Sequence, residues 1–120
     1  MTEQQILDKV ISYKREMGFL VWRAPVFSRF RWDIFKVFDL LCVSRGGLVK
    51  FIQATTYKHL SDRRKKISAI LGMDAVRFDF EIWAYNPVDD TFSIEHSDRK
   101  GIIKRYKLCL NSGISKKTEL

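Results

Sequence analysis

The residues best suited to chemistry lie in two neighbouring strand-like segments. Asp39 stands in the apolar run "KVFDLLCV", and Gln53 and Thr55 stand in "FIQATT". A carboxylate among apolar side chains costs free energy unless it is paired or binds a cation. Gln53 and Thr55 are two residues apart, so on a strand they point to the same side. Because Mg²⁺ accepts carboxylate, amide and carbonyl oxygens, these residues are candidates for a divalent-metal centre.

A β-hairpin is expected to bring the two segments together. The turn signal "RGG" at residues 45–47 separates "DIFKVFDLLCVS" from "LVKFIQAT", so the pattern over residues 34–54 predicts a hairpin. A turn at these glycines pairs Asp39 with a residue near position 54. Asp39, Gln53 and Thr55 are therefore expected to meet on one face, at the open end of the strand pair.

A strongly basic segment follows the second strand. The run "YKHLSDRRKKI" contains five lysine or arginine residues and a single acidic residue, Asp62. The apolar spacing predicts a helix over residues 58–71, followed by Gly72 as the C′ residue. The expected core positions of this helix are Leu60, Ile67, Ile70 and Leu71. The charge suits phosphate binding, with a solvated helix face as the alternative. His59 could carry a proton or lie at the surface.

The segment before the hairpin predicts a helix and a strand. Residues 3–17 have the apolar spacing of an amphipathic helix, with Thr2 as its N-cap and Gly18 ending it. The expected core positions of this helix are Ile6, Val10, Tyr13 and Met17. "FLVWRA" then predicts a strand that Pro25 stops. Residues 26–32 predict an exposed loop or a second short strand.

Three further strands are expected in "AVRFDFEIWAYN", "TFSIEHS" and "GIIKRYKLCL". The first of them alternates, so Asp79 and Glu81 are expected to point outward to the surface. In the second, Phe92 and Ile94 are expected to point inward.

These elements give the order α-β-β-β-α-β-β-β. The expected fold class is α/β (α+β), with a mixed β-sheet flanked by helices. A strand, a helix and a further strand usually form a right-handed crossover between parallel strands. Residues 1–111 are expected to form a single domain, and residues 112–120 a polar C-terminal tail.

The overall charge favours a polyanionic partner. The formal net charge is +8 and the pI is about 9.7, which favours nucleic acid first and an acidic membrane second, although many basic domains bind neither. The polar N-terminus and the lack of a long apolar run predict a cytoplasmic protein without a signal peptide or a membrane span. The spacing of Cys42 and Cys109 suits no metal motif, so both are expected to be reduced core thiols.

The run "WDIFKVFDLLCVSRGGLVKFIQATTYKHLSDRRKKI" resembles the PD-(D/E)XK nuclease superfamily. It is similar to small phage and archaeal proteins of that superfamily and to archaeal Holliday junction resolvases. The likeness covers roughly residues 5–85, and "GFLVWRAPVFS" is similar to the entry segment G-[FY]-x-v-x-R-x-x-x-S. It implies a restriction-endonuclease-like core, in which a hairpin carries Asp and (Glu/Gln)-x-(Lys/Thr) and is followed by a helix and further strands.

The resemblance also implies roles for individual residues. Asp39 would be the central metal ligand, Gln53 would occupy the usual Glu position, and Ala54 would offer its carbonyl oxygen. Thr55 would occupy the usual Lys position, where an ammonium would position or activate the attacking water. Gln in place of Glu removes one negative charge from the metal site. The first-helix acid that binds metal in some members would be Asp8, with Glu3 as the alternative. Asp33 has no firm counterpart in the family but could stand near the substrate.

The expected activity is hydrolysis of DNA phosphodiesters with Mg²⁺ or Mn²⁺, by an endonuclease or a resolvase-like nuclease that forms a homodimer on a two-fold junction. The expected DNA-binding residues are Arg23, Ser28, Arg29, Arg31, Lys58, Arg63, Arg64 and Lys66. Trp32 could stack on a base. Two alternatives stay open. One is a catalytically silent nucleic-acid-binding protein of the same fold, and the other is a viral-type protein-interaction module.

Overall fold

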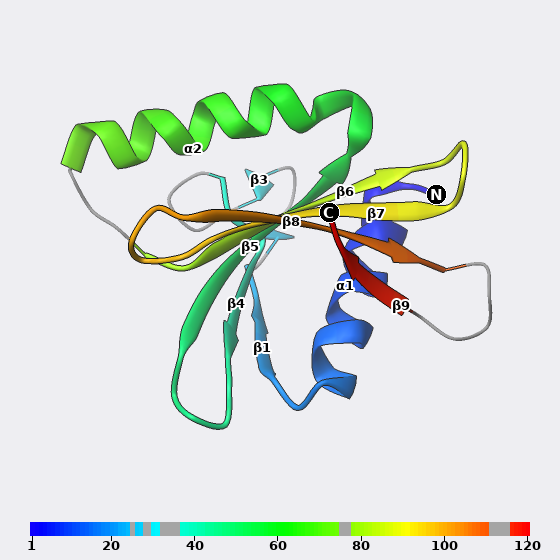
Figure 1. The fold of residues 1–120 in the computed structure, drawn as a ribbon, viewed down its shortest axis with the longest axis horizontal. Helices are drawn as coiled ribbons and strands as arrows, with labels where there is room; N and C mark the ends of the chain where they lie inside the picture. The colour runs from blue at the N-terminus through cyan, green and yellow to red at the C-terminus, as the bar shows by residue number, and fades with distance from the viewer. Residues whose placement is uncertain (25, 28–29, 32–36, 75–77, 111–115) are drawn as a thin grey trace.

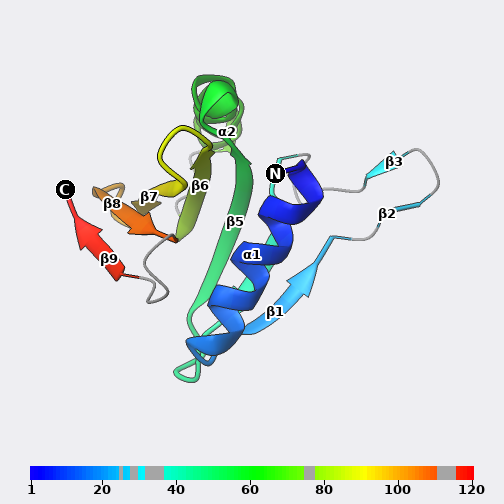
Figure 2. The same ribbon diagram turned by 90° about the vertical axis from the view of Figure 1, so that its right-hand side faces the viewer.

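The computed structural model describes residues 1–24, 26–27, 30–31, 37–74, 78–110 and 116–120 of the 120-residue chain. Within these ranges, the side chains of residues 26–27, 30–31, 72–74 and 116–117 are not described. Figures 1 and 2 show a sheet with one long helix on each side.

The helices and strands follow one another along the chain from α1 to β9. They are α1 (Glu3–Glu16), β1 (Leu20–Arg23), β2 (Val26–Phe27), β3 (Phe30–Arg31), β4 (Leu40–Val43), β5 (Val49–Thr56), the 3-10 helix η1 (Tyr57–His59), α2 (Leu60–Asp74), β6 (Phe80–Asn86), β7 (Thr91–Ser97), β8 (Ile103–Cys109) and β9 (Lys116–Glu119).

Seven of these strands form one mixed sheet, in the order β1-β4-β5-β6-β7-β8-β9. Strands β5 and β6 are parallel, and every other neighbouring pair is antiparallel. Strands β2 and β3 pair with each other as a separate hairpin. Because α2 connects β5 to its parallel neighbour β6, these three elements form the expected strand–helix–strand crossover. The expected α+β class with a mixed sheet flanked by helices is confirmed.

The second half of the chain differs from expectation in two places. Helix α2 runs to Asp74, so the expectation that Gly72 follows the helix is wrong. A helical glycine costs only about 1 kcal/mol, which neighbouring turns can offset. The residues expected to be a polar tail include β9, which pairs with β8. The backbone of Lys116–Glu119 therefore continues the sheet although its side chains are polar.

Helix α1 begins and ends as its sequence predicts. Thr2 forms a capping box with Gln5: its hydroxyl accepts the Gln5 backbone N–H, and the Gln5 side chain accepts the Thr2 N–H. Gly18 has a φ of +90°, a value that a residue with a side chain rarely adopts, so the helix ends there. Met17, an expected core position, is 53% exposed, because α1 ends at Glu16 and Met17 is its C-cap.

The two helices cover opposite faces of the sheet. The α1-side core consists of Ile6, Leu7, Val10, Ile11, Leu40, Cys42, Ile52, Trp83, Tyr85, Phe92, Ile94 and Leu108. The α2-side core consists of Val37, Phe38, Leu60, Ile67, Phe80, Ile82 and Ala84, with Phe51, Ile70, Leu71 and Phe78 packed against it. Successive residues of β5 thus face different helices, since Phe51 faces α2 and Ile52 faces α1. The expected core positions of α2, together with Phe92 and Ile94, are confirmed.

Both cysteines are free thiols, as expected. Cys42 is fully buried, and Cys109 is half-buried. Burial raises the pKa of the Cys42 thiol to about 11, which keeps it protonated and unreactive at neutral pH. In the described part of the chain, neither α1 nor α2 is long and apolar enough to cross a bilayer.

Candidate functional site

The hairpin of β4 and β5 places Asp39 where the two strands stop pairing. Leu40 is opposite Ile52, and the Asp39 backbone N–H donates to the Ile52 carbonyl at 2.9 Å. Two residues further along β5, the Asp39 side chain takes part in the pairing: its Oδ2 accepts the backbone N–H of Ala54 at 2.9 Å. Asp39 is 3% exposed. The carboxylate therefore replaces the carbonyl that a longer partner strand would offer to β5. It lies beside residues 53–55, as the turn predicted.

Gln53 and Thr55 are also buried at this end of the hairpin, with 4% and 1% exposure. The Gln53 side-chain amide donates to the carbonyl oxygen of Ala54 at 2.9 Å. The Thr55 hydroxyl has no hydrogen-bond partner among the residues that the structure describes. Asp39, Gln53 and Ala54 are thus linked by hydrogen bonds, and Thr55 lies on the same strand two residues after Gln53.

These residues do not fit a divalent-metal centre. Among the described residues of this site, Asp39 supplies the single carboxylate. Its Oδ2 accepts a backbone N–H, and the Ala54 carbonyl accepts the Gln53 amide. Within the described ranges, no group of three or more His, Cys, Asp or Glu side chains could hold a metal ion. Asp8, the expected first-helix ligand, instead accepts a hydrogen bond from the Gln4 side chain at 2.9 Å and forms an ion pair with Arg23 at 3.5 Å. The Asp39 carboxylate therefore has a structural role.

Asp39→Ala is expected to lower the free energy of unfolding by about 1–3 kcal/mol, because it leaves the partly buried Ala54 N–H without its acceptor. Asp39→Asn keeps an oxygen at that place and is expected to cost less. Urea unfolding measures both, with the exposed Asp8→Asn as the control. The wild-type Tm is expected to be the same in Mg²⁺ and in EDTA, and a Mg²⁺-dependent rise that Asp39→Asn removes would contradict the structural role.

Apart from Arg64, the expected DNA-binding residues fall into three groups. Arg23 is partly engaged on the surface, since it donates to Gln4 and pairs with Asp8. Lys58 and Lys66 are exposed, and Arg63 is half-buried, with an Nε that has no partner among the described residues. Four predicted positions lie outside what the structure describes: residues Ser28, Arg29, Trp32 and Asp33, together with the side chain of Arg31.

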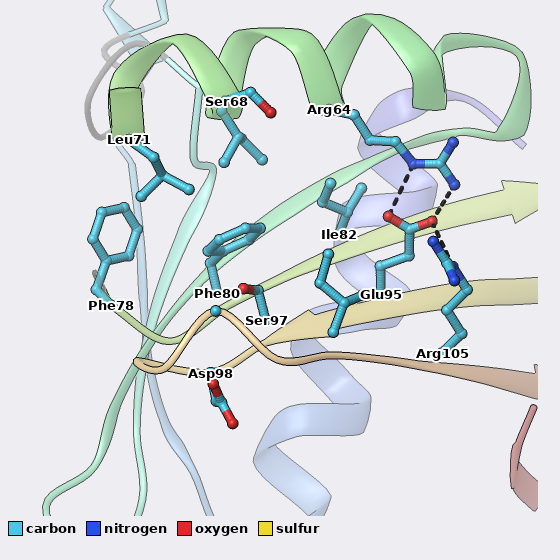
Figure 3. Close-up of a pocket in the computed structure, with 13 residues that line it drawn as sticks. Arg64, Ser68, Leu71, Phe78, Phe80, Ile82, Glu95, Ser97, Asp98 and Arg105 are labelled. Atoms are coloured by element: carbon cyan, nitrogen blue, oxygen red, sulfur yellow. Dashed lines mark hydrogen bonds and ion pairs between the residues drawn. The ribbon is translucent and has the colours of Figure 1, made fainter. Parts of the chain in front are cut away.

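Arg64 is held by a carboxylate that the sequence did not indicate. Its Nε donates to Glu95 Oε2 at 2.9 Å, and its Nη2 pairs with Oε1 of the same residue. Arg105 from β8 reaches Oε1 at 3.5 Å. Although burial acts to raise it, the hydrogen bonds and charges of Arg64 and Arg105 hold the pKa of Glu95 below its ordinary value. The three side chains form one cluster with a net charge of one positive unit, and this is the Arg64–Glu95–Arg105 cluster of Figure 3.

A buried ion pair lies on the other face of the sheet. Lys14 of α1 and Glu81 of β6 are 2% and 1% exposed, and Lys14 Nζ lies 2.7 Å from Glu81 Oε1. The Trp83 indole N–H also donates to this oxygen at 3.0 Å, and Lys50 approaches Oε2 at 3.5 Å. The Lys14 ammonium lies over the Phe19 ring, 4.7 Å from its centroid. Glu81 is thus paired and hydrogen-bonded within the α1-side core.

The expectation that Glu81 lies at the surface is wrong, because α1 covers the face to which the alternation points it. Burial alone would raise the pKa of Glu81, but Lys14, then Lys50 and Trp83, lower it to about 2. Asp79 is also partly buried, 13% exposed, and lies 3.5 Å from His96 Nε2. One signal was present in the sequence: Lys14 follows Val10 by four residues and so falls on the apolar stripe of α1.

A pocket of about 290 Å³ lies between α2 and the strands β6, β7 and β8. Its walls include Ile67, Ser68 and Leu71 from α2, and Phe80 and Ile82 from β6 (Figure 3). The Arg64–Glu95–Arg105 cluster lies at one end of the pocket. The sequence did not predict this pocket. Comparison of the chain with protein-family models, with curated proteins and with solved structures finds no match.

Proposed function

We propose that this chain binds nucleic acid, and that it holds the phosphate backbone with a basic surface formed by η1, α2 and β8. We assign Lys58, Arg64, Lys65, Lys66 and Arg105 to this basic surface. The observation that carries the proposal is the convergence of Arg64 and Arg105, from α2 and β8, on the single carboxylate of Glu95. One carboxylate cannot use all the N–H groups of two guanidinium groups, so both can donate to phosphate as well.

The surroundings of the cluster support the same partner. Arg64 and Arg105 are 46% and 60% exposed, so both guanidinium groups reach solvent. Lys65 and Lys66 are exposed on the same helix. The net charge of +8 adds a long-range attraction for a polyanion. The resemblance to the PD-(D/E)XK superfamily also supports it, because the helix that follows the hairpin carries several of the expected DNA-binding residues.

The proposal does not include cleavage. The resemblance implies a metal-dependent nuclease, but Asp39 Oδ2 accepts the Ala54 N–H, and the Ala54 carbonyl oxygen accepts the Gln53 side-chain amide. Within the part of the chain that the structure describes, this site has one carboxylate, fewer than a two-metal mechanism requires. We therefore favour a protein of this fold that binds nucleic acid without cutting it.

Binding is expected to weaken steeply with salt, because lysine and arginine displace counterions from the phosphates. Lys65→Ala/Lys66→Ala is expected to reduce affinity for single-stranded and duplex DNA alike, and to reduce the salt slope by about 1–2. Fluorescence anisotropy over a salt series measures both quantities. The matched control is Lys9→Ala/Arg15→Ala, which removes the same charge from exposed positions of α1, on the opposite side of the sheet.

Two results would count against the proposal. Absence of binding at low salt would contradict it outright, and an equal loss in the α1 control would show that net charge, and no particular surface, sets the affinity. Incubation with plasmid and branched DNA in Mg²⁺ or Mn²⁺ tests separately whether the protein cuts DNA. Metal-dependent products that Asp39→Asn abolishes would show that the protein cuts DNA.

A further inference from the structure

The pocket beneath α2 has an apolar body and a charged end. Its apolar walls come from Ile67 and Leu71 on α2, from Phe80 and Ile82 on β6, and from Phe78, just before β6. The charged end is the Arg64–Glu95–Arg105 cluster, and Figure 3 shows it at the opposite end from Phe78. A ligand with an apolar part and a negatively charged group would match the apolar walls and the two arginines at this end of the pocket.

The aromatic wall favours a flat apolar part. The rings of Phe78 and Phe80 meet at 61° with centroids 5.9 Å apart, so a planar group that stacks on one ring meets the edge of the other. Phe78 is half-buried, and Phe80 is 8% exposed. Ser68 and Ser97 add hydroxyl groups to the lining, and each can donate or accept a hydrogen bond. A heteroaromatic ring with polar edges matches this combination.

The size and charge of the pocket narrow the ligand further. A volume of about 290 Å³ lies just below the range of about 300–1,000 Å³ that holds drug-sized ligands, so the ligand is small. At one end, Arg64 and Arg105 carry two positive charges against the carboxylate of Glu95. A second carboxylate, Asp98, also lines the pocket, near Phe80 and Ser97 and away from the two arginines (Figure 3). An anionic group of the ligand would therefore be attracted to the end where the two guanidinium groups reach solvent.

We propose that this pocket takes the base of one unpaired nucleotide of a bound strand, while Arg64 and Arg105 hold an adjoining phosphate. The inference rests on the proposed function and adds to it a preference for unpaired nucleotides. A base inside a duplex is stacked and paired, so it cannot enter a pocket walled by α2 and the sheet. A base in a single strand, a bulge or a frayed end can stack on an aromatic side chain instead.

The test is to fill the pocket without changing its charge. Ser68 is exposed on α2 and lines the pocket, so the indole of Ser68→Trp would occupy the space of the base. The control is Ala69→Trp, at the next exposed position of α2, which does not line the pocket. Ser68→Trp is expected to weaken binding of a short mixed-sequence single strand roughly tenfold, the value of one stacked base. Binding of the matching duplex is expected to be unchanged in both variants.

A second measurement covers the case in which Ser68→Trp does not fold. In the wild type, the methyl NMR signals of Ile82 and Ile103, which line the pocket, are expected to shift when the single strand is added. The signals of Ile6 and Ile11, in the α1-side core, are expected to stay in place.

The outcomes separate the two proposals. If the wild type binds neither strand nor duplex, both the proposed function and this inference fail. If the wild type binds both, but Ser68→Trp weakens them equally or not at all, or the strand leaves the signals of Ile82 and Ile103 unmoved, then nucleic-acid binding stands and the base pocket is wrong.

Discussion

Glu81→Gln is expected to lower the free energy of unfolding by about 3–5 kcal/mol, because it leaves the Lys14 ammonium in the core without its carboxylate. The pair has a 2.7 Å contact, and both side chains are at least 98% buried. Neither partner can turn to water when the other is removed. In a domain of this size the loss corresponds to a fall in Tm of roughly 10–20 °C. Urea unfolding and thermal melting measure it.

Two further variants separate the ion pair from the loss of one charge. Glu16→Gln, at an exposed position of α1, removes the same charge and is expected to change stability by less than about 0.5 kcal/mol. Lys14→Met/Glu81→Leu removes both charges and is expected to regain most or all of the loss, since an apolar pair avoids the cost of desolvating two ions. If Glu81→Gln were as stable as the Glu16→Gln control, the Lys14–Glu81 ion pair would not form in solution.

Acid is expected to remove the stability that the same carboxylate provides. The pKa of Glu81 is about 2 in the folded chain, against an ordinary value of 4.5. Because the folded state holds the proton less tightly than the unfolded state, the contribution is complete above pH 4.5 and is lost as the pH falls through about 2. The difference corresponds to roughly 3 kcal/mol. Urea unfolding at a series of pH values between these limits measures it.

The double variant Lys14→Met/Glu81→Leu serves as the reference for this pH dependence. It keeps the other carboxylates whose pKa is lowered, including that of Glu95. Acid is therefore expected to lower its free energy of unfolding less than that of the wild type, and the difference is the contribution of Glu81. Equal slopes for the two proteins would place the pKa of Glu81 near its ordinary value and would contradict the ion pair.

The ion pair and the proposed binding surface lie on opposite faces of the sheet. Lys14 and Glu81 belong to the α1 side, whereas the Arg64–Glu95–Arg105 cluster lies on the α2 side. Stability and nucleic-acid affinity are therefore expected to vary independently. Lys14→Met/Glu81→Leu should bind DNA like the wild type, and Lys65→Ala/Lys66→Ala should unfold like it.

The contacts that the sequence predicted correctly are those within a short stretch of chain. The glycine turn fixes which residue of β5 lies opposite β4, so the position of Asp39 beside residues 53–55 follows from local geometry. The start of α1 is likewise fixed by the capping box at Thr2, and its end by Gly18 with a positive φ, and both signals lie next to the helix in the sequence. The metal-ligand roles, in contrast, depended on how the buried side chains pair, and in the folded chain Gln53 and Asp39 bond to Ala54.

The sequence by itself determined most elements of this protein, the register of its central hairpin and its basic helix, but it did not predict β9. Only the tertiary structure decided what covers each face of the sheet. An alternating strand shows that Glu81 points away from Phe80, but not that α1 packs on that side and brings Lys14 to it. In the same way, Arg64 and Glu95 are 31 residues apart in the chain. They meet, and enclose a pocket, because the crossover lays α2 over the strands that follow it.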